Sequence, residues 1–140
     1  MAGFRLVSNL NEVEYRKVRV ASQAYTIGDA VMRQVTADST DVVPATSSTT
    51  SQFLIGVAME TVASAATSLL VAIIEPSQKW ECEVANTVTA DDNYQWMVLT
   101  DANTVNNTHS DSTADEAIVQ QVGISGTKGI FEFKQGGEST

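Results

Sequence analysis

The 140-residue sequence has only one cysteine, Cys82, and one histidine, His109. A single cysteine excludes an internal disulfide framework and a cysteine-rich zinc site, and a single histidine removes most metal centres and acid–base pairs. No apolar run approaches the ~18 residues that a membrane-spanning helix needs. Residues 1–10 lack the apolar core of a signal peptide, so we expect no targeting segment. We therefore expect no metal, no cofactor and no membrane association.

Basic side chains are scarce as well. Eight Lys and Arg stand against 17 Asp and Glu, which gives a formal net charge of −9. Nucleic-acid binding depends on many cations that neutralise phosphates, so a nucleic-acid partner is not expected. The bases are concentrated at the start of the chain: residues 1–33 hold five bases and three acids (+2), and residues 34–140 hold three bases and fourteen acids (−11).

The two residues most relevant to catalysis fit structural roles better. Cys82 alternates with Trp80 on the apolar side of a strand-like segment, and Glu81 and Glu83 flank it. Carboxylates and apolar burial both raise a thiol pKa, so Cys82 is interpreted as a small buried hydrophobe. His109 lies in a polar stretch that we expect to be a solvated loop. We predict that the protein is not an enzyme.

Valine and isoleucine total 24 against six leucines, a balance that favours strands over helices. The pattern predicts an all-β fold: a compact antiparallel β-barrel or sandwich of about eight short strands with an extended N-terminal arm. Residues 1–12 are expected to form the arm, 13–135 a single β domain and 136–140 a flexible tail. The expected strands are 13–21, 30–35, 53–60, 69–74, 79–84, 94–100, 117–124 and 129–134, with long loops at 36–52 and 101–115.

Two of the expected strands, 53–60 and 69–74, are apolar on both faces. Such strands are buried on two sides, and this pattern indicates additional burial in a homo-oligomer. Gly56 is expected to mark a bulge or a close approach of two backbones.

Four short segments follow one another in an order that resembles a known group. The segments are Gly28-Asp29-Ala30-Val31, Val43-Pro44-Ala45-Thr46, Leu54-Ile55-Gly56-Val57-Ala58 and Leu70-Val71-Ala72-Ile73-Ile74. Their order resembles that of the small β-barrel capsid decoration (cement) proteins of tailed bacteriophages, and the resemblance covers about residues 25–75.

The resemblance implies a non-enzymatic protein, made in the host cytoplasm, that binds the outer surface of the virion head. Its partner is then the major capsid protein, and it stabilises capsomer contacts, often as a homotrimer. The acidic region 79–116 departs from the pattern. An alternative is a phage tail, fibre or head-fibre module that recognises a host-surface glycan with exposed Trp and Tyr side chains. A small enzyme or its regulatory subunit is a third class.

The charge split also predicts a docking element. If the capsid exterior is acidic, a basic extended arm is the natural attractive contact with it. The capsid-docking residues predicted on this basis are Phe4, Arg5, Leu6, Arg16, Lys17 and Arg19. In the alternative, residues 14–21 are simply the first barrel strand with a solvated basic face, and docking lies on the loops 36–52 or 101–115.

Overall fold

The protein is all-β, as the sequence predicts. The computed structural model describes residues 3–8, 13–21, 23–34, 41–49, 53–75, 77–110 and 118–134, with the side chains of residues 109 and 110 left out. These residues form eleven strands and one short 3₁₀ helix. The elements are β1 (Arg5–Leu6), β2 (Tyr15–Arg19), β3 (Ala30–Arg33), β4 (Val42–Pro44), β5 (Leu54–Ala58), β6 (Ser68–Ile73), β7 (Trp80–Val84), η3 (Ala90–Asp92), β8 (Trp96–Asp101), β9 (Thr104–Ser110), β10 (Val119–Ser125) and β11 (Lys128–Phe133).

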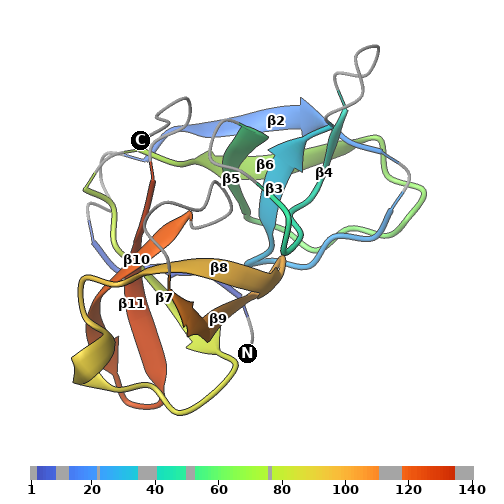
Figure 1. Ribbon diagram of the computed structural model, residues 1–140. Helices are drawn as coiled ribbons and strands as arrows, with labels where there is room; N and C mark the ends of the chain where they lie inside the picture. The colour runs from blue at the N-terminus through green and yellow to red at the C-terminus, as the bar shows by residue number, and fades with distance from the viewer. Residues whose placement is uncertain are drawn as a thin grey trace.

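The strands form two sheets that pack together in a sandwich-like arrangement (Figure 1). One sheet has the order β2-β6-β5-β3-β4, and the other has the order β1-β7-β11-β10-β8-β9. Each sheet also curls until two of its strands meet in parallel. A parallel bridge joins Val20, just after β2, to Val42 in β4, and β7 pairs with β9 through Val84 and Val105. We call residues 15–73 the first lobe and residues 79–133 the second lobe.

The two lobes repeat one strand plan. In chain order, β2, β3, β4, β5 and β6 correspond to β7, β8, β9, β10 and β11. With this correspondence, the order β2-β6-β5-β3-β4 of the first sheet becomes β7-β11-β10-β8-β9, which is the order of the second sheet after β1. The closing contact is repeated as well: the Ala21 N–H donates to the Val42 carbonyl at 3.1 Å, and the Ala85 N–H donates to the Val105 carbonyl at 2.8 Å. The chain is therefore built from two copies of a five-stranded unit.

Two hydrophobic clusters fill the molecule. One lies within the first lobe and includes Tyr25, Leu69 and Val71. The larger cluster combines second-lobe side chains such as Trp80 with Val57 and Ala72 of the first lobe, and so joins the two sheets. Strands β5 and β6 thus contribute to both clusters. The prediction of two-sided burial is confirmed, but this chain itself covers both faces, so the pattern does not require a second copy.

The eight predicted strands are present, but the structure has three more. Strand β1 lies in the expected arm, and β4 lies in the expected loop 36–52. The prediction of a loop at 101–115 is also wrong, because Thr104–Ser110 form β9. The strand pairs with β8 on one side and with β7 on the other. His109 is therefore part of a strand rather than a loop. Pairing on both edges, rather than an apolar pattern of its own, holds this polar segment extended.

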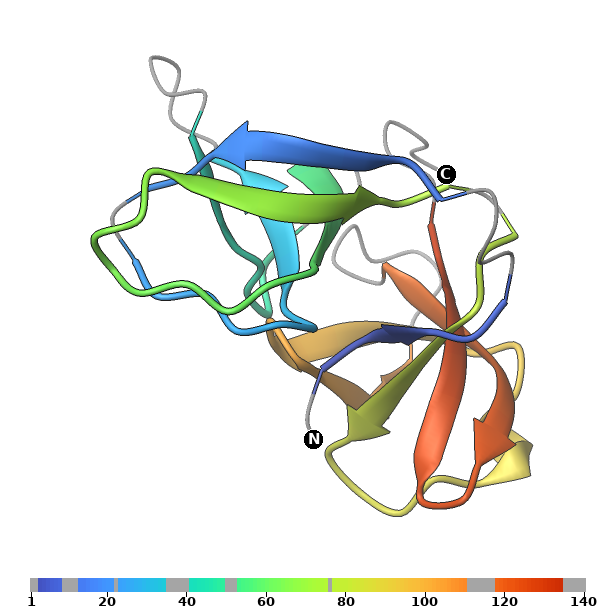
Figure 2. The same ribbon diagram turned by 180° about the vertical axis from the view of Figure 1, so that it is seen from behind.

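The N-terminal segment 3–8 lies against both lobes instead of extending from the body (Figure 2). The Gly3 N–H donates to the Asn103 carbonyl of the second lobe at 3.0 Å, and the Phe4 N–H donates to the Gly28 carbonyl of the first lobe at 2.8 Å. Strand β1 adds to the second sheet by pairing with β7. The described part of the expected arm is thus an element of the fold, while residues 1–2, 9–12 and the expected tail 136–140 lie outside the described residues.

Candidate docking surface

Of the six predicted docking residues, one has a side chain in the core, and the other five have side chains that are exposed or partly buried. Phe4 is 4% exposed, and its ring packs against Phe133 with the ring centroids 4.8 Å apart. It is therefore a core residue, and the expectation of an apolar anchor on a free arm is corrected here. Hydrophobic burial between the lobes explains the difference, since an arm that carried Phe4 into solvent would expose an aromatic ring.

A pocket of about 330 Å³ lies beside β1, where the two lobes meet. Its walls are mainly apolar. Phe4, Arg5 and Leu6 line it from the N-terminal segment, Tyr15 and Ile27 from the first lobe, and Lys128 from the second. Tyr15 is 52% exposed and Ile27 is 36% exposed, so the pocket opens to solvent between large apolar side chains.

The structure thus brings three predicted docking residues together with two that the sequence analysis missed. Arg16, Lys17 and Arg19 continue along β2 from Tyr15. Tyr15 and Ile27 had no distinctive signal, because nothing in a single sequence separates an exposed apolar side chain from a core one.

Each predicted docking cation forms an ion pair within the chain. Arg5 lies 3.1 Å from Glu81, Lys17 lies 3.1 Å from Glu60, and Arg19 lies 2.7 Å from Asp41. Arg16 pairs with Glu14. All four cations remain more than 60% exposed, and such surface pairs contribute only about 0–1 kcal/mol, so a partner can exchange with them readily.

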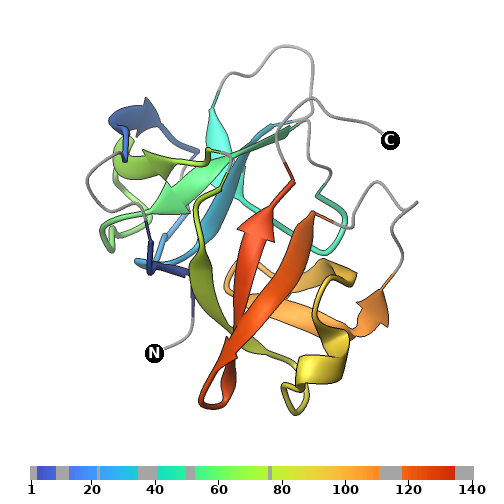
Figure 3. The ribbon, with the colours of Figure 1, turned by 90° about the vertical axis from the view of Figure 1, so that its left-hand side faces the viewer.

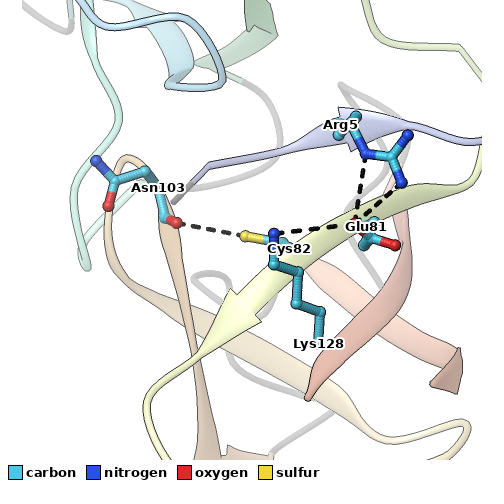
Figure 4. A network of polar contacts seen from close by, with 5 residues as sticks. All are labelled: Arg5, Glu81, Cys82, Asn103 and Lys128. Atoms are coloured by element: carbon cyan, nitrogen blue, oxygen red, sulfur yellow. Dashed lines mark hydrogen bonds and ion pairs between the residues drawn. The ribbon is translucent and has the colours of Figure 1, made fainter. Parts of the chain in front are cut away.

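Glu81 is the common partner of two cations at the pocket (Figure 4). Arg5 approaches its carboxylate from β1, and Lys128 lies 3.9 Å away on β11. A hydrogen bond from the Ser125 side chain and the neighbouring Arg5 hold the pKa of Glu81 below its usual value. The pocket therefore has two cations around one ionised carboxylate, a local charge of +1 on a strongly acidic protein.

The Gly28-Asp29 turn, which begins the first of the four motif segments, joins the two lobes. Asp29 is 7% exposed. Its carboxylate accepts hydrogen bonds from the Thr26 N–H at 3.0 Å and from the Asn103 side-chain amide at 3.2 Å. Gly28 has a φ of +98° and packs directly on Gly3, which has a φ of +106°. We call Gly3, Gly28, Asp29 and Asn103 the interlobe junction.

The aromatic side chains mostly belong to the core. Trp80 and Phe131 are fully buried, and Phe133 is 7% exposed. Trp96 is half-buried, with the Lys134 ammonium 5.3 Å from the ring centroid. Tyr94 alone of these aromatics stands well out in solvent, at 73% exposure. These side chains therefore do not form a stacking platform of several exposed rings.

Cys82 is fully buried, as predicted, and its Sγ donates to the Asn103 carbonyl at 3.4 Å. Burial raises the pKa of the thiol strongly, and the nearby Glu83 raises it further. A nucleophilic thiolate is therefore strongly disfavoured at this position.

Cys82 is accordingly expected to resist thiol reagents while the protein is folded. With a colorimetric disulfide reagent at about pH 8, we expect full reaction in denaturant and at least ~100-fold slower reaction in its absence, because the thiol must first be exposed by unfolding. Rapid stoichiometric labelling of the native protein would contradict both its burial and its raised pKa.

No group of three or more His, Cys, Asp or Glu side chains among the described residues is arranged to hold a metal ion. Within the same residues, no helix is long and apolar enough to cross a membrane. Comparison with known proteins finds no matching family model and no match among the curated proteins.

Proposed function

We propose that the protein is a non-enzymatic decoration protein that binds the outer surface of a tailed-bacteriophage head and stabilises contacts between capsomers. The observation that carries the proposal is where the motif segments lie. All four lie in the first lobe, with Ile74 just past its end, and backbone hydrogen bonds join them. The Gly28 N–H donates to the Ala58 carbonyl at 2.9 Å, the Ala45 N–H to the Ala30 carbonyl at 2.8 Å, and the Ile74 N–H to the Ile55 carbonyl at 3.2 Å. The order that resembles decoration proteins thus coincides with the framework of one folding unit.

The distribution of charge supports a particular orientation on the head. Residues 15–73 contain four bases and four acids and are neutral, whereas residues 79–133 contain two bases and nine acids and carry −7. If the capsid exterior is acidic, it repels the second lobe at −7 but not the neutral first lobe. In that case the first lobe, with β2, faces the major capsid protein, and the second lobe points away from the shell.

The direct test uses heads that lack the protein. Such heads are expected to assemble, to bind the purified protein on their outer surface, and to retain their DNA to a higher temperature once it is bound. Sedimentation with the heads measures binding, and dye access to DNA during heating measures stability. Failure to sediment, or equal heat stability with and without the protein, would contradict decoration, and a glycan-array signal in that case would favour the host-adhesion alternative.

Neutralising two cations of β2 tests the orientation. Replacing Lys17 and Arg19 with glutamine is expected to weaken capsid binding about tenfold at low salt and to reduce its salt dependence, because both face the shell in this arrangement. The melting temperature of the free protein should shift little, since both cations are more than 60% exposed.

A matched control for these variants lies on the second lobe. Lys79 is 45% exposed and pairs with Glu132 at 2.9 Å, much as Lys17 pairs with Glu60. Replacing Lys79 with glutamine should leave capsid binding unchanged. Equal losses from Lys17→Gln alone and from Lys79→Gln, each of which removes one positive charge, would mean that net charge, and not the first lobe, determines binding.

A further inference from the structure

Tyr94 is held rigidly in an unusual position. It is 73% exposed and has a φ of +72°, a backbone conformation that is rare for a bulky residue. Its N–H donates to the Gln121 carbonyl at 2.6 Å, and its carbonyl accepts from the Gln120 side-chain amide at 3.1 Å. A large ring is therefore presented to solvent by a backbone that is fixed on both sides. Strain of this kind points to a function for the exposed side chain.

Acidic residues precede this ring. Asp91 and Asp92 lie in η3, which Thr89 caps by accepting a hydrogen bond from the Asp91 N–H. Rigid aromatic side chains are the commonest anchors of protein interfaces, because little conformational entropy is lost when they are buried. We call Tyr94 with Asp91 and Asp92 the acidic knob.

The pocket beside β1 has the complementary properties. Its lining is mainly apolar, and the cationic residues Arg5 and Lys128 are part of that lining. An aromatic ring flanked by carboxylates matches both its lining and its charge. Trp80 also lines the pocket, and its indole Nε1 is buried without a hydrogen-bond partner.

The knob and the pocket lie on different sides of the molecule. The pocket adjoins β1, at one end of the second sheet, and η3 contacts β10, with β7 and β11 between β1 and β10 in the strand order. In Figure 3 the N-terminal segment is accordingly to the left and η3, in yellow, to the lower right. A single chain therefore cannot place its own Tyr94 in its own pocket.

We propose that Tyr94 of one copy inserts into the pocket of a second copy, with Asp91 and Asp92 beside Arg5 and Lys128. Charge favours this head-to-tail contact, because Asp91 and Asp92 of one copy meet the cations of Arg5 and Lys128 of the next, whereas two acidic knobs repel each other. A contact between different surfaces repeats from copy to copy and closes into a ring when the rotation allows it. The inference concerns the free protein and does not rest on capsid binding.

Two variants that each remove one half of the contact provide the test. Tyr94→Asn removes the knob with a residue that tolerates a positive φ, and Ile27→Glu places a charge at the pocket. The unsubstituted protein should be oligomeric by sedimentation equilibrium, and each variant alone should associate at least about tenfold more weakly. Ile124→Asn, which changes a 46% exposed side chain elsewhere in the second lobe, should associate normally.

Mixing the two variants gives the decisive result. Tyr94→Asn keeps an intact pocket and Ile27→Glu keeps an intact knob, so together they should form a one-to-one dimer that grows no further. Tyr15→Ser replaces Ile27→Glu if circular dichroism shows that the latter does not fold. A monomeric native protein at millimolar concentration, normal association of Tyr94→Asn, or no dimer in the mixture would each overturn the proposal. Capsid binding by a monomer would separate this failure from failure of the decoration function.

Discussion

Replacing Gly56 with alanine is expected to destabilise the protein by about 3 kcal/mol or more, which is a large fraction of the stability of a domain this size. Gly56 lies in β5 opposite β6, where a Cβ atom would be 2.1 Å from the Ala72 carbonyl oxygen and 2.5 Å from a methyl carbon of Val71. The nearest atom belongs to the backbone of a paired strand, so it cannot move aside without breaking the ladder. Urea denaturation followed by circular dichroism measures the loss.

The second lobe offers a matched control for Gly56. Gly123 lies in β10, and a Cβ atom there would meet nothing closer than 3.8 Å. Gly123→Ala should therefore change the free energy of unfolding by less than about 1 kcal/mol. The loss of conformational freedom in the unfolded chain adds a small stabilising contribution. Similar losses for the two variants would mean that strand propensity, and not the close approach at Gly56, governs the effect.

Gly56 also illustrates what the sequence could predict. An apolar strand interrupted by glycine predicts a close backbone approach, and the structure confirms it. Alternation identified Trp80 and Cys82 as inward-facing, and both are fully buried. These predictions succeeded because the information lies in neighbouring residues, where side chains alternate between the two faces of a strand.

The features that sequence reasoning missed depend on contacts between distant segments. Strand β9 contains no apolar alternation, and its extended form comes from pairing with β7 and β8. The repeat of the two lobes is hidden because equivalent positions hold different residues. Val18 faces Leu69 across one ladder where Cys82 faces Gly129 across the other, so a small side chain replaces a large one at each place.

The candidate docking surface was predicted only in part, for the same reason. Charge counting identified Arg5 and Lys17 as exposed cations, and they are exposed. It could not detect that Glu81 and Glu60 pair with them, because these partners are 76 and 43 residues away along the chain. The pocket likewise exists only where the N-terminal segment meets both lobes.

The interlobe junction yields the second large effect. Asp29→Ala is expected to destabilise the protein by about 3 kcal/mol, because the Thr26 N–H and the Asn103 amide both lose an acceptor in a buried place. Hydrogen bonds to a charged group are the stronger kind, and one of these two joins the lobes. Glu132→Ala is the control: it removes a partly exposed ion pair within the second lobe and should cost less than about 1 kcal/mol.

Exchanging the two side chains tests whether the contact itself matters. Asp29→Asn alone sets the amide group of the new side chain against the Asn103 amide, so that donor faces donor and stability falls. Adding Asn103→Asp restores a donor opposite an acceptor, while the side-chain carbonyl introduced at position 29 can still accept from the Thr26 N–H. The double variant should therefore recover at least half of the loss in thermal unfolding, a coupling that independent sites do not show. Losses that simply add would mean that Asp29 stabilises the Gly28 turn alone, and that the lobes are held together by Phe4 and the shared core.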